Sequence, residues 1–272
     1  MYNKNSTVSK INRGEKPVLS EMFMEVYNLA QTVNKESEGA FDITVAPLVN
    51  AWGFGFKTRQ IPDKHKVDSI LAFIGNDKFK VVNEGKQLVP KKTDARTMLD
   101  FSAIAKGYGS DVVARLLRSH DVKNFMVEIG GEIVTSGNSE KRLPWKIGVT
   151  KPVDDSISVD GELQTVLNLT DKAMATSGNY RKFYYKNGKK YAHTIDPKTG
   201  KPVQHNILSA TVIAKDCATA DAYATAFMVL GLEKTKRVLE KHPELMAYLI
   251  YSGEKGENAV WFSPSLEGKV AN

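Results

Sequence analysis

The sequence predicts an α+β fold, in which antiparallel sheets are combined with segregated helices. Apolar residues recur at helical spacing in several stretches, whereas residues 143–203 alternate with a period of two and contain Asn-Gly and Thr-Gly turns. Neither an internal repeat nor a low-complexity linker divides the chain. We therefore expect a single domain that covers residues 1–272.

The first half of the chain is expected to be mainly helical. Behind Ser20, which can cap a first turn, apolar side chains follow helical spacing as far as Glu38. Residues 39–55 are too rich in glycine, proline and aromatics for ordinary surface and should form a loop with a short helix. The remaining elements are a helix over 65–75, a hairpin over 78–92 that turns at Asn83 to Gly85, and a strand and turn that lead within 97–121 into a long helix ending near His120.

The second half is expected to be mainly antiparallel sheet. Alternating apolar and polar residues between glycine turns are typical of hairpins, whereas two helical patterns here end at Gly231 and Pro243, which stop helices. In order, the expected elements are a strand pair over 124–138 bent at Gly130 and Gly131, further strands over 143–203, a strand over 207–214, helices over 218–230 and 232–242, and a closing hairpin over 245–264.

Charge and cysteine content exclude several classes of protein. The formal net charge is +7, but the lysines are scattered over hairpin tips and helix faces, so nucleic-acid binding is not expected. The longest apolar stretches, such as 246–251, have the length of a strand, so no membrane span is expected. A single cysteine, Cys217, allows neither an intramolecular disulfide nor a cysteine-held metal cluster, and its small neighbours favour a buried, unreactive side chain.

The stretch DCATADAYATA, residues 216–226, places polar groups among alanines in an expected helix. Asp221 and Thr225 are four residues apart, so they lie on the same helix face. A carboxylate and a hydroxyl offer oxygen ligands, which suit a hard cation such as Mg²⁺. Taken alone, the pattern favours a capped helix, in which Asp216 or Thr219 caps the N-terminus and Asp221 only favours the positive end of the dipole.

Two other stretches contain candidate functional groups. In LDFSAIAKGYG, Lys106 and two glycines open a helix whose free N–H groups attract anions, although the spacing of a P-loop is missing. A packing contact with Lys106 in solvent is the alternative. His193 ends a strand just before an Asp-Pro and Thr-Gly turn, and histidine is suited to proton transfer near neutral pH. A histidine that only hydrogen-bonds to the turn fits equally well.

The order of these stretches is more specific than any one of them. The chain carries, in sequence, EGAFDITVAPLVNAWGFG, LDFSAIAKGYG, VEIGGEI, ATSGNYRKF, HTIDPKTGKP and DCATADAYATA. In this order they resemble the motif set of the ApbE family, the FAD:protein FMN transferases once described as thiamine biosynthesis lipoproteins. The resemblance extends from about Tyr2 to the closing hairpin, and it implies an ApbE-like α+β fold.

The resemblance also implies an activity and a set of site residues. It implies a Mg²⁺-dependent enzyme that transfers the FMN half of FAD to a threonine hydroxyl of an acceptor flavoprotein subunit and releases AMP. By the same matching, Asp221, Thr225 and the backbone carbonyl of Ala103 would hold the metal, and His193 would be the base. The residues that would contact FAD are Tyr2, Ala40, Phe41, Asp42, Asp100, Lys106 and Ile195.

The beginning of the chain departs from the family pattern. Members normally start with a secretion signal, often of a lipoprotein, and then a strand with a Met-Gly-Thr motif that borders the flavin; the polar residues 1–16 match neither. We expect weaker FAD binding and an unpaired neighbouring strand from this departure. The resemblance implies that the full-length protein is exported, as a periplasmic or cell-envelope lipoprotein.

Two other functions fit the same residues. In an FAD pyrophosphatase, water would replace the acceptor threonine, and FMN and AMP would be released with the same metal and phosphate ligands. A flavin-binding or carrier protein would bind FAD without turnover. Such a protein has no need of a base, so His193 beside Asp221 and Thr225 favours an enzyme.

Overall fold

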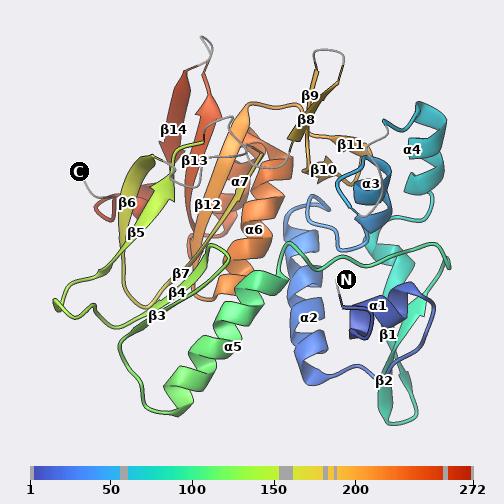
Figure 1. Ribbon diagram of the computed structural model, residues 1–272, viewed down its shortest axis with the longest axis horizontal. Coiled ribbons are helices and arrows are strands. Elements are labelled where there is room, and N and C mark those ends of the chain that lie inside the picture. The colour runs from blue at the N-terminus through green and yellow to red at the C-terminus, as the bar shows by residue number, and fades with distance from the viewer. Residues whose placement is uncertain are drawn as a thin grey trace.

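The computed structural model describes residues 3–55, 61–152, 162–179, 183–186, 189–253 and 257–270. Its centre is a six-stranded antiparallel sheet with the strand order β14-β13-β12-β7-β4-β3 (Figure 1). The strands of this sheet are β3 (Phe125–Ile129), β4 (Glu132–Ser136), β7 (Ala173–Gly178), β12 (Ile207–Ala214), β13 (Met246–Ser252) and β14 (Asn258–Phe262). The predicted α+β class with antiparallel sheets is confirmed.

Four two-stranded hairpins surround the central sheet. They are β1 (Phe79–Glu84) with β2 (Gln87–Lys92), β5 (Trp145–Thr150) with β6 (Leu163–Leu169), β8 (Phe183–Lys186) with β9 (Lys189–Ala192), and β10 (Ile195–Asp196) with β11 (Lys201–Pro202). The helices are α1 (Thr7–Asn12), α2 (Glu21–Glu36), α3 (Ala46–Ala51), α4 (Lys64–Leu71), α5 (Ala105–Ser119), α6 (Cys217–Leu230) and α7 (Leu232–Lys241). None of the described helices is long and apolar enough to cross a bilayer.

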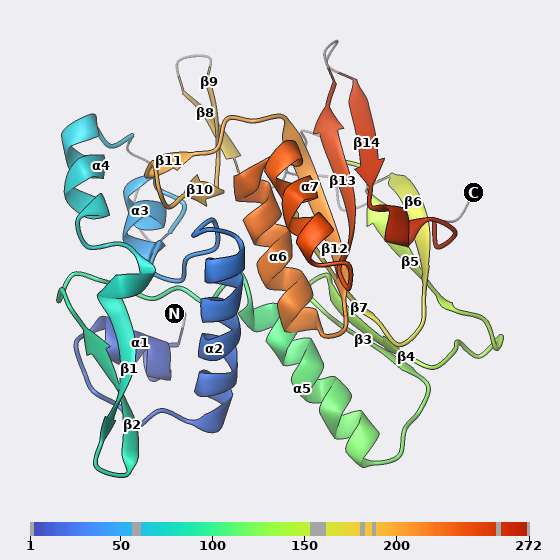
Figure 2. The same cartoon turned by 180° about the vertical axis from the view of Figure 1, so that it is seen from behind.

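Helix α6 is the central helix of the molecule. It packs on β12 and β7 on one side and on α2 and α5 on the other, and Figure 2 shows it in front of the sheet and beside α2. Its five alanines from Ala218 to Ala226 are at most 2% exposed. A helix buried all round needs small residues wherever another element approaches closely. Close packing therefore accounts for the alanines of DCATADAYATA.

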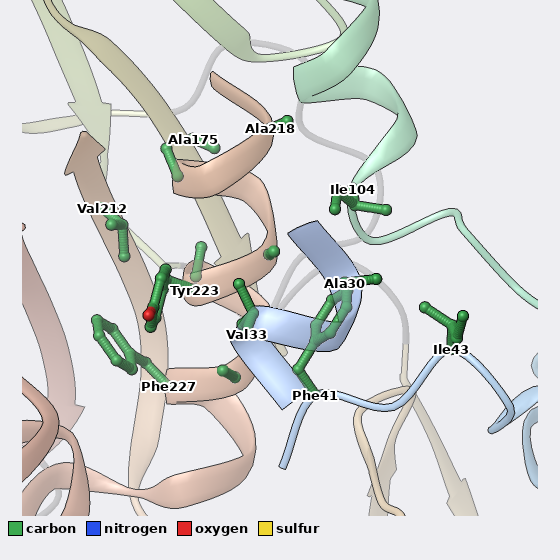
Figure 3. Packing of buried hydrophobic residues seen from close by; sticks show 14 of the residues in the cluster. Ala30, Val33, Phe41, Ile43, Ile104, Ala175, Val212, Ala218, Tyr223 and Phe227 are labelled. Carbon is green, nitrogen blue, oxygen red and sulfur yellow. The ribbon is translucent and has the colours of Figure 1, made fainter. Parts of the chain in front are cut away.

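The main core lies between α6, α2 and the loop that follows α2. Figure 3 shows Tyr223 and Phe227 of α6 near Val212 of the sheet, with Ala30 and Val33 of α2 beside Phe41. A separate cluster around Leu48, Trp52 and Ile195 supports α3, α4 and the β10–β11 hairpin. The segment of residues 40–55 is thereby fixed from both sides by buried apolar contacts.

Most predicted elements are confirmed, and local signals set their ends. Ser20 caps α2, because its hydroxyl accepts a hydrogen bond from Phe23 N at 3.2 Å. Gly231 has φ +78° and ends α6 as expected. Cys217 is buried, as predicted, and burial raises the pKa of its thiol.

Two parts of the structure differ from the predictions. The strand expected at the start of 97–121 is wrong: Met98 makes only an isolated bridge to Val45, and Asp100 N donates to Ile43 O at 2.7 Å. This segment is extended because single residues of it bond to the loop after α2. It does not form part of a sheet. The short helix α1 was not predicted; Ser6 caps it through Ser9 N at 3.2 Å.

Candidate active site at the crossing of α5 and α6

The site begins where the first turns of α5 and α6 touch. Gly107 of α5 packs so closely that a Cβ added to it would lie 2.3 Å from the carbonyl oxygen of Cys217. Asp111, one turn along α5, accepts hydrogen bonds from Cys217 N and Ala218 N, both at 2.8 Å. Burial raises the pKa of Asp111. These contacts hold the two helices in one fixed arrangement.

Asp221 lies directly beneath this crossing. Its side chain is 3% exposed, and its Oδ2 accepts a hydrogen bond from Gly107 N at 3.1 Å. Burial raises the pKa of Asp221 to about 6; the charge of Glu132 adds to this rise, whereas Lys106 and the Gly107 hydrogen bond oppose it. The N-cap of α6 is Asp216, which accepts from Thr219 N at 2.9 Å. Capping of α6 therefore explains Asp216 but not Asp221, whose carboxylate instead bonds an N–H group in the first turn of α5.

The other two predicted metal ligands belong to the two segments that meet at Asp221. Thr225 is one turn further along α6, and its hydroxyl is 3.1 Å from the hydroxyl of Ser177 at the end of β7. Ala103 lies in the turn just before α5, four residues ahead of Gly107, whose N–H bonds Asp221. One carboxylate, one hydroxyl and one carbonyl make an all-oxygen set of the kind that hard cations prefer.

The local charge also fits a cation. Two buried carboxylates, Asp221 and Glu132, interact with the single ammonium of Lys106, which leaves one negative charge in excess when all three are ionised. Throughout the described residues, no group of three or more His, Cys, Asp or Glu side chains could hold a metal by itself. The donor set and its charge therefore fit Mg²⁺ that is also bound by substrate phosphate, and they do not fit zinc.

Lys106 is held in place by Glu132, a residue that the sequence did not single out. Lys106 Nζ donates to Glu132 Oε1; the lysine side chain is 47% exposed and the glutamate side chain 2%. Burial raises the pKa of Glu132, and Lys106 opposes that rise. The available signal was a glutamate in the stretch VEIGGEI, at the start of β4 and directly after Gly130 and Gly131. Lys106 is therefore more than a solvated surface lysine.

His193 follows β9, and its neighbour Thr194 ties this segment to the residue that follows β7. Its half-buried ring meets the edge of Phe54, with 6.4 Å between the ring centroids. The next residue, Thr194, is buried and its hydroxyl donates to Asn179 Oδ1 at 2.6 Å. Asn179 and Ser177 are two residues apart at the end of β7, a span of roughly 7 Å. The segment that carries His193 is thus bound to the same strand end as Thr225.

The loop of residues 39–43 joins both parts of the site. Ile43 O accepts from Asp100 N, and Asp100 Oδ1 accepts from Ser102 N at 2.8 Å in the turn before α5. On the other side, a Cβ added to Gly39 would lie 3.6 Å from Cε of Lys198, just beyond His193. This loop therefore lies between the start of α5 and the turn that follows β10.

The remaining predicted FAD contacts are mostly buried. Ala40, Phe41 and Ile195 are 3–5% exposed, so a ligand would meet these residues through their backbone. Asp42 Oδ1 accepts from Thr44 N at 2.7 Å and from Thr44 Oγ1 at 2.6 Å, while burial raises the pKa of Asp42. Tyr2 lies outside the described residues.

Known proteins match nearly the whole chain. The sequence model of the ApbE family matches residues 1–250. The chain belongs to the ApbE family. Among curated ApbE relatives, "FAD:protein FMN transferase" of Haemophilus influenzae is 39% identical over 263 residues, which is 94% of this chain and 74% of the relative. The protein of the same name from Escherichia coli strain K12 is 34% identical over 272 residues, covering 98% and 76% of the two chains.

Solved ApbE structures share the fold. "Flavin Transferase ApbE from Vibrio cholerae" superposes with a TM-score of 0.84 at 36% identity, covering 98% of this chain and 83% of that one. The apo form of Pseudomonas stutzeri flavinyl transferase ApbE gives the same TM-score at 29% identity, with 98% and 82% covered. The ApbE-like fold expected from the sequence is thereby confirmed.

Proposed function

We propose that this ApbE-family protein is an FAD:protein FMN transferase, which moves FMN from FAD to a threonine hydroxyl of an acceptor flavoprotein subunit and releases AMP. Relatives with that name match nearly the whole chain. The observation that carries the proposal is the buried Asp221, which lies against the first turn of α5 next to Thr225 and Lys106. A carboxylate kept at such an unfavourable position is typical of a functional site.

The reaction breaks one phosphorus–oxygen bond and forms another. The threonine oxygen of the acceptor attacks the FMN phosphorus, and the bond to the AMP oxygen breaks. Asp221, Thr225 and the carbonyl of Ala103 would hold Mg²⁺, which when bound supplies positive charge to the phosphate oxygens. Lys106 presents its ammonium to the same diphosphate from the start of α5.

His193 would act on the incoming threonine. A threonine hydroxyl is a weak nucleophile and needs a base within reach. His193 is held by its neighbour Thr194 on the end of β7, the strand end that also contacts Thr225. We therefore assign His193 the acceptance of the threonine proton.

The activity is tested with FAD, a candidate acceptor flavoprotein subunit and this protein, in Mg²⁺ and in EDTA. We expect intact-mass spectrometry to show one FMN added to an acceptor threonine in Mg²⁺ only, with an equal amount of AMP. Free FMN and AMP with an unmodified acceptor would instead identify a pyrophosphatase. Bound FAD without any product would identify a carrier.

Changing His193 to alanine is expected to slow FMN transfer about 10²- to 10⁴-fold, the usual contribution of a general base. FAD affinity should change by less than about threefold, because the histidine acts on the acceptor and not on the flavin nucleotide. Single-turnover transfer and FAD fluorescence titration measure the two quantities. His65→Ala, on the exposed surface of α4, is the control. Equal rates of FMN transfer by the two variants would show that His193 is not the base.

We also propose that the protein acts outside the cytoplasm, as the family resemblance implies. Fractionation of cells that express the full-length protein checks this location. Recovery in the cytoplasmic fraction would contradict it.

A further inference from the structure

Glu132 carries a buried oxygen atom without a partner. Its Oε1 accepts from Lys106 Nζ, but within the part of the chain described here its Oε2 has no hydrogen-bond partner and no exposure to solvent. Buried carboxylate oxygens are normally hydrogen-bonded, and an unpaired one destabilises the fold. The Lys106 side chain is half exposed to water, and an ion pair with an exposed partner adds little to stability. Stability therefore does not explain Glu132.

The surroundings of Glu132 fix its position closely. Glu132 pairs with Ile129 across the β3–β4 hairpin, and its backbone carbonyl oxygen accepts a hydrogen bond from Ser110 Oγ of α5 at 2.9 Å. Gly130, with φ +64°, covers the ion pair: a Cβ there would lie 3.4 Å from Cδ of Lys106 and 3.5 Å from Glu132 Oε2. The carboxylate is thus rigid where the lysine side chain passes over it.

This rigidity acts on Lys106. A lysine side chain has a flexible stem of four carbons and loses much rotamer freedom when its ammonium must stay in one place. Here the stem lies against Gly130 and one N–H is bound to Glu132, while the side chain is still 47% exposed on its other side. The remaining two N–H groups are available to phosphate oxygens. Lys106 directly precedes Gly107, whose N–H bonds Asp221, so the lysine belongs to the turn that meets this candidate metal ligand.

We propose that Glu132 is a positioning residue, which holds the Lys106 ammonium in the orientation required by the diphosphate before FAD binds. It contacts neither substrate nor metal and acts only through Lys106. This inference rests on the proposed function, because it names the residue that prepares the phosphate-binding lysine of that same site. Preorganised charge contributes to rate without reorganisation during the reaction.

The first readout is the chemical reactivity of Lys106 in the absence of FAD and acceptor. Glu132→Gln keeps the shape of the side chain and removes the charge, and we expect an amine-acylating reagent to label Lys106 faster than in the unchanged protein, as followed by peptide mass spectrometry. Glu132→Asp, whose carboxylate is one methylene shorter, should give an intermediate rate and serves if the glutamine variant fails to fold. Glu128→Gln, on the exposed face of β3, is the matched control.

The second readout is turnover in a double-mutant cycle. Glu132→Gln should lower the rate constant of transfer about 10- to 100-fold, as expected for a misplaced reacting group, with FAD affinity changed less than threefold. In a Lys106→Met background the same change should have no further effect on the rate, because Glu132 acts on transfer only through Lys106. A melting curve for each variant separates loss of stability from loss of position.

Three results would overturn the inference. They are an unchanged labelling rate of Lys106 in both Glu132 variants, an effect on transfer no larger than that of Glu128→Gln, and a full additional loss of rate when Glu132→Gln is combined with Lys106→Met. If the unchanged protein transfers no FMN, the proposed function fails, yet the labelling experiment still decides whether Glu132 holds Lys106.

Discussion

Gly107→Ala is expected to lower the free energy of unfolding by about 2 kcal/mol and to remove FMN transfer. The new Cβ would lie 2.3–2.9 Å from backbone atoms of Cys217 and Ala218, which cannot rotate away as a side chain can. Overpacking of this kind costs up to about 3 kcal/mol, and the better helix propensity of alanine returns roughly 1 kcal/mol. Separation of the helices also breaks the Gly107–Asp221 hydrogen bond. Urea unfolding and the transfer assay measure both effects.

Gly109→Ala is the matched control for this change. Gly109 lies two residues later on α5, and its added Cβ would meet only Ile129 Cδ1 at an ordinary 3.7 Å. This substitution should stabilise the protein by up to about 1 kcal/mol, since it replaces glycine in a helix without a clash. Equal behaviour of the two alanine variants would show that the close approach of α5 and α6 at Gly107 is not required.

Asp221→Asn is expected to abolish Mg²⁺-dependent transfer and yet to stabilise the protein without substrate above pH 6. Burial raises the pKa of Asp221 from 3.8 to about 6 in the folded state, so folding favours the protonated carboxyl. Below about pH 4 this preference is fully present, and it is lost as the pH rises through 6, where the folded protein must ionise a buried group. Two pKa units correspond to about 3 kcal/mol.

The measurement is the free energy of unfolding of both proteins at pH 4.5 and pH 8 without Mg²⁺. The asparagine variant should gain most over the unchanged protein at pH 8 and little at pH 4.5. Asp68→Asn on the exposed face of α4 controls for a general loss of negative charge. A difference between Asp221→Asn and the unchanged protein that is the same at both pH values would contradict the buried, ionised carboxylate.

The sequence predicted those elements whose ends are set locally. Ser20 and Gly231 mark helix ends by their own side chains or backbone conformation, and the helices α2 and α6 were found from them. The strand expected before α5 was wrong because the extended shape of that segment depends on Ile43, far away in the sequence. Periodicity contains no information about such a partner.

The same distinction applies to the candidate site. Asp221 and Thr225 could be paired from a helical spacing of four residues. Glu132 could not, because it acquires its role from Lys106, which is 26 residues away. Asp111 was missed for the same reason, since its carboxylate binds backbone groups more than 100 residues further along the chain. Side chains that support a site are found only when the fold brings their partners together.

The end of β7 restricts where insertions and deletions can occur in the sequence of this enzyme. Ser177 contacts Thr225 and Asn179 contacts Thr194, so the end of β7 connects a candidate metal ligand to the segment that carries His193. A slip of β7 by one residue relative to β12 would turn Ser177 to the opposite face of the sheet and would also displace Asn179, which directly follows the strand. Insertions and deletions should therefore accumulate in hairpin tips around the site, while the length of the chain between Ser177 and Asn179 stays fixed.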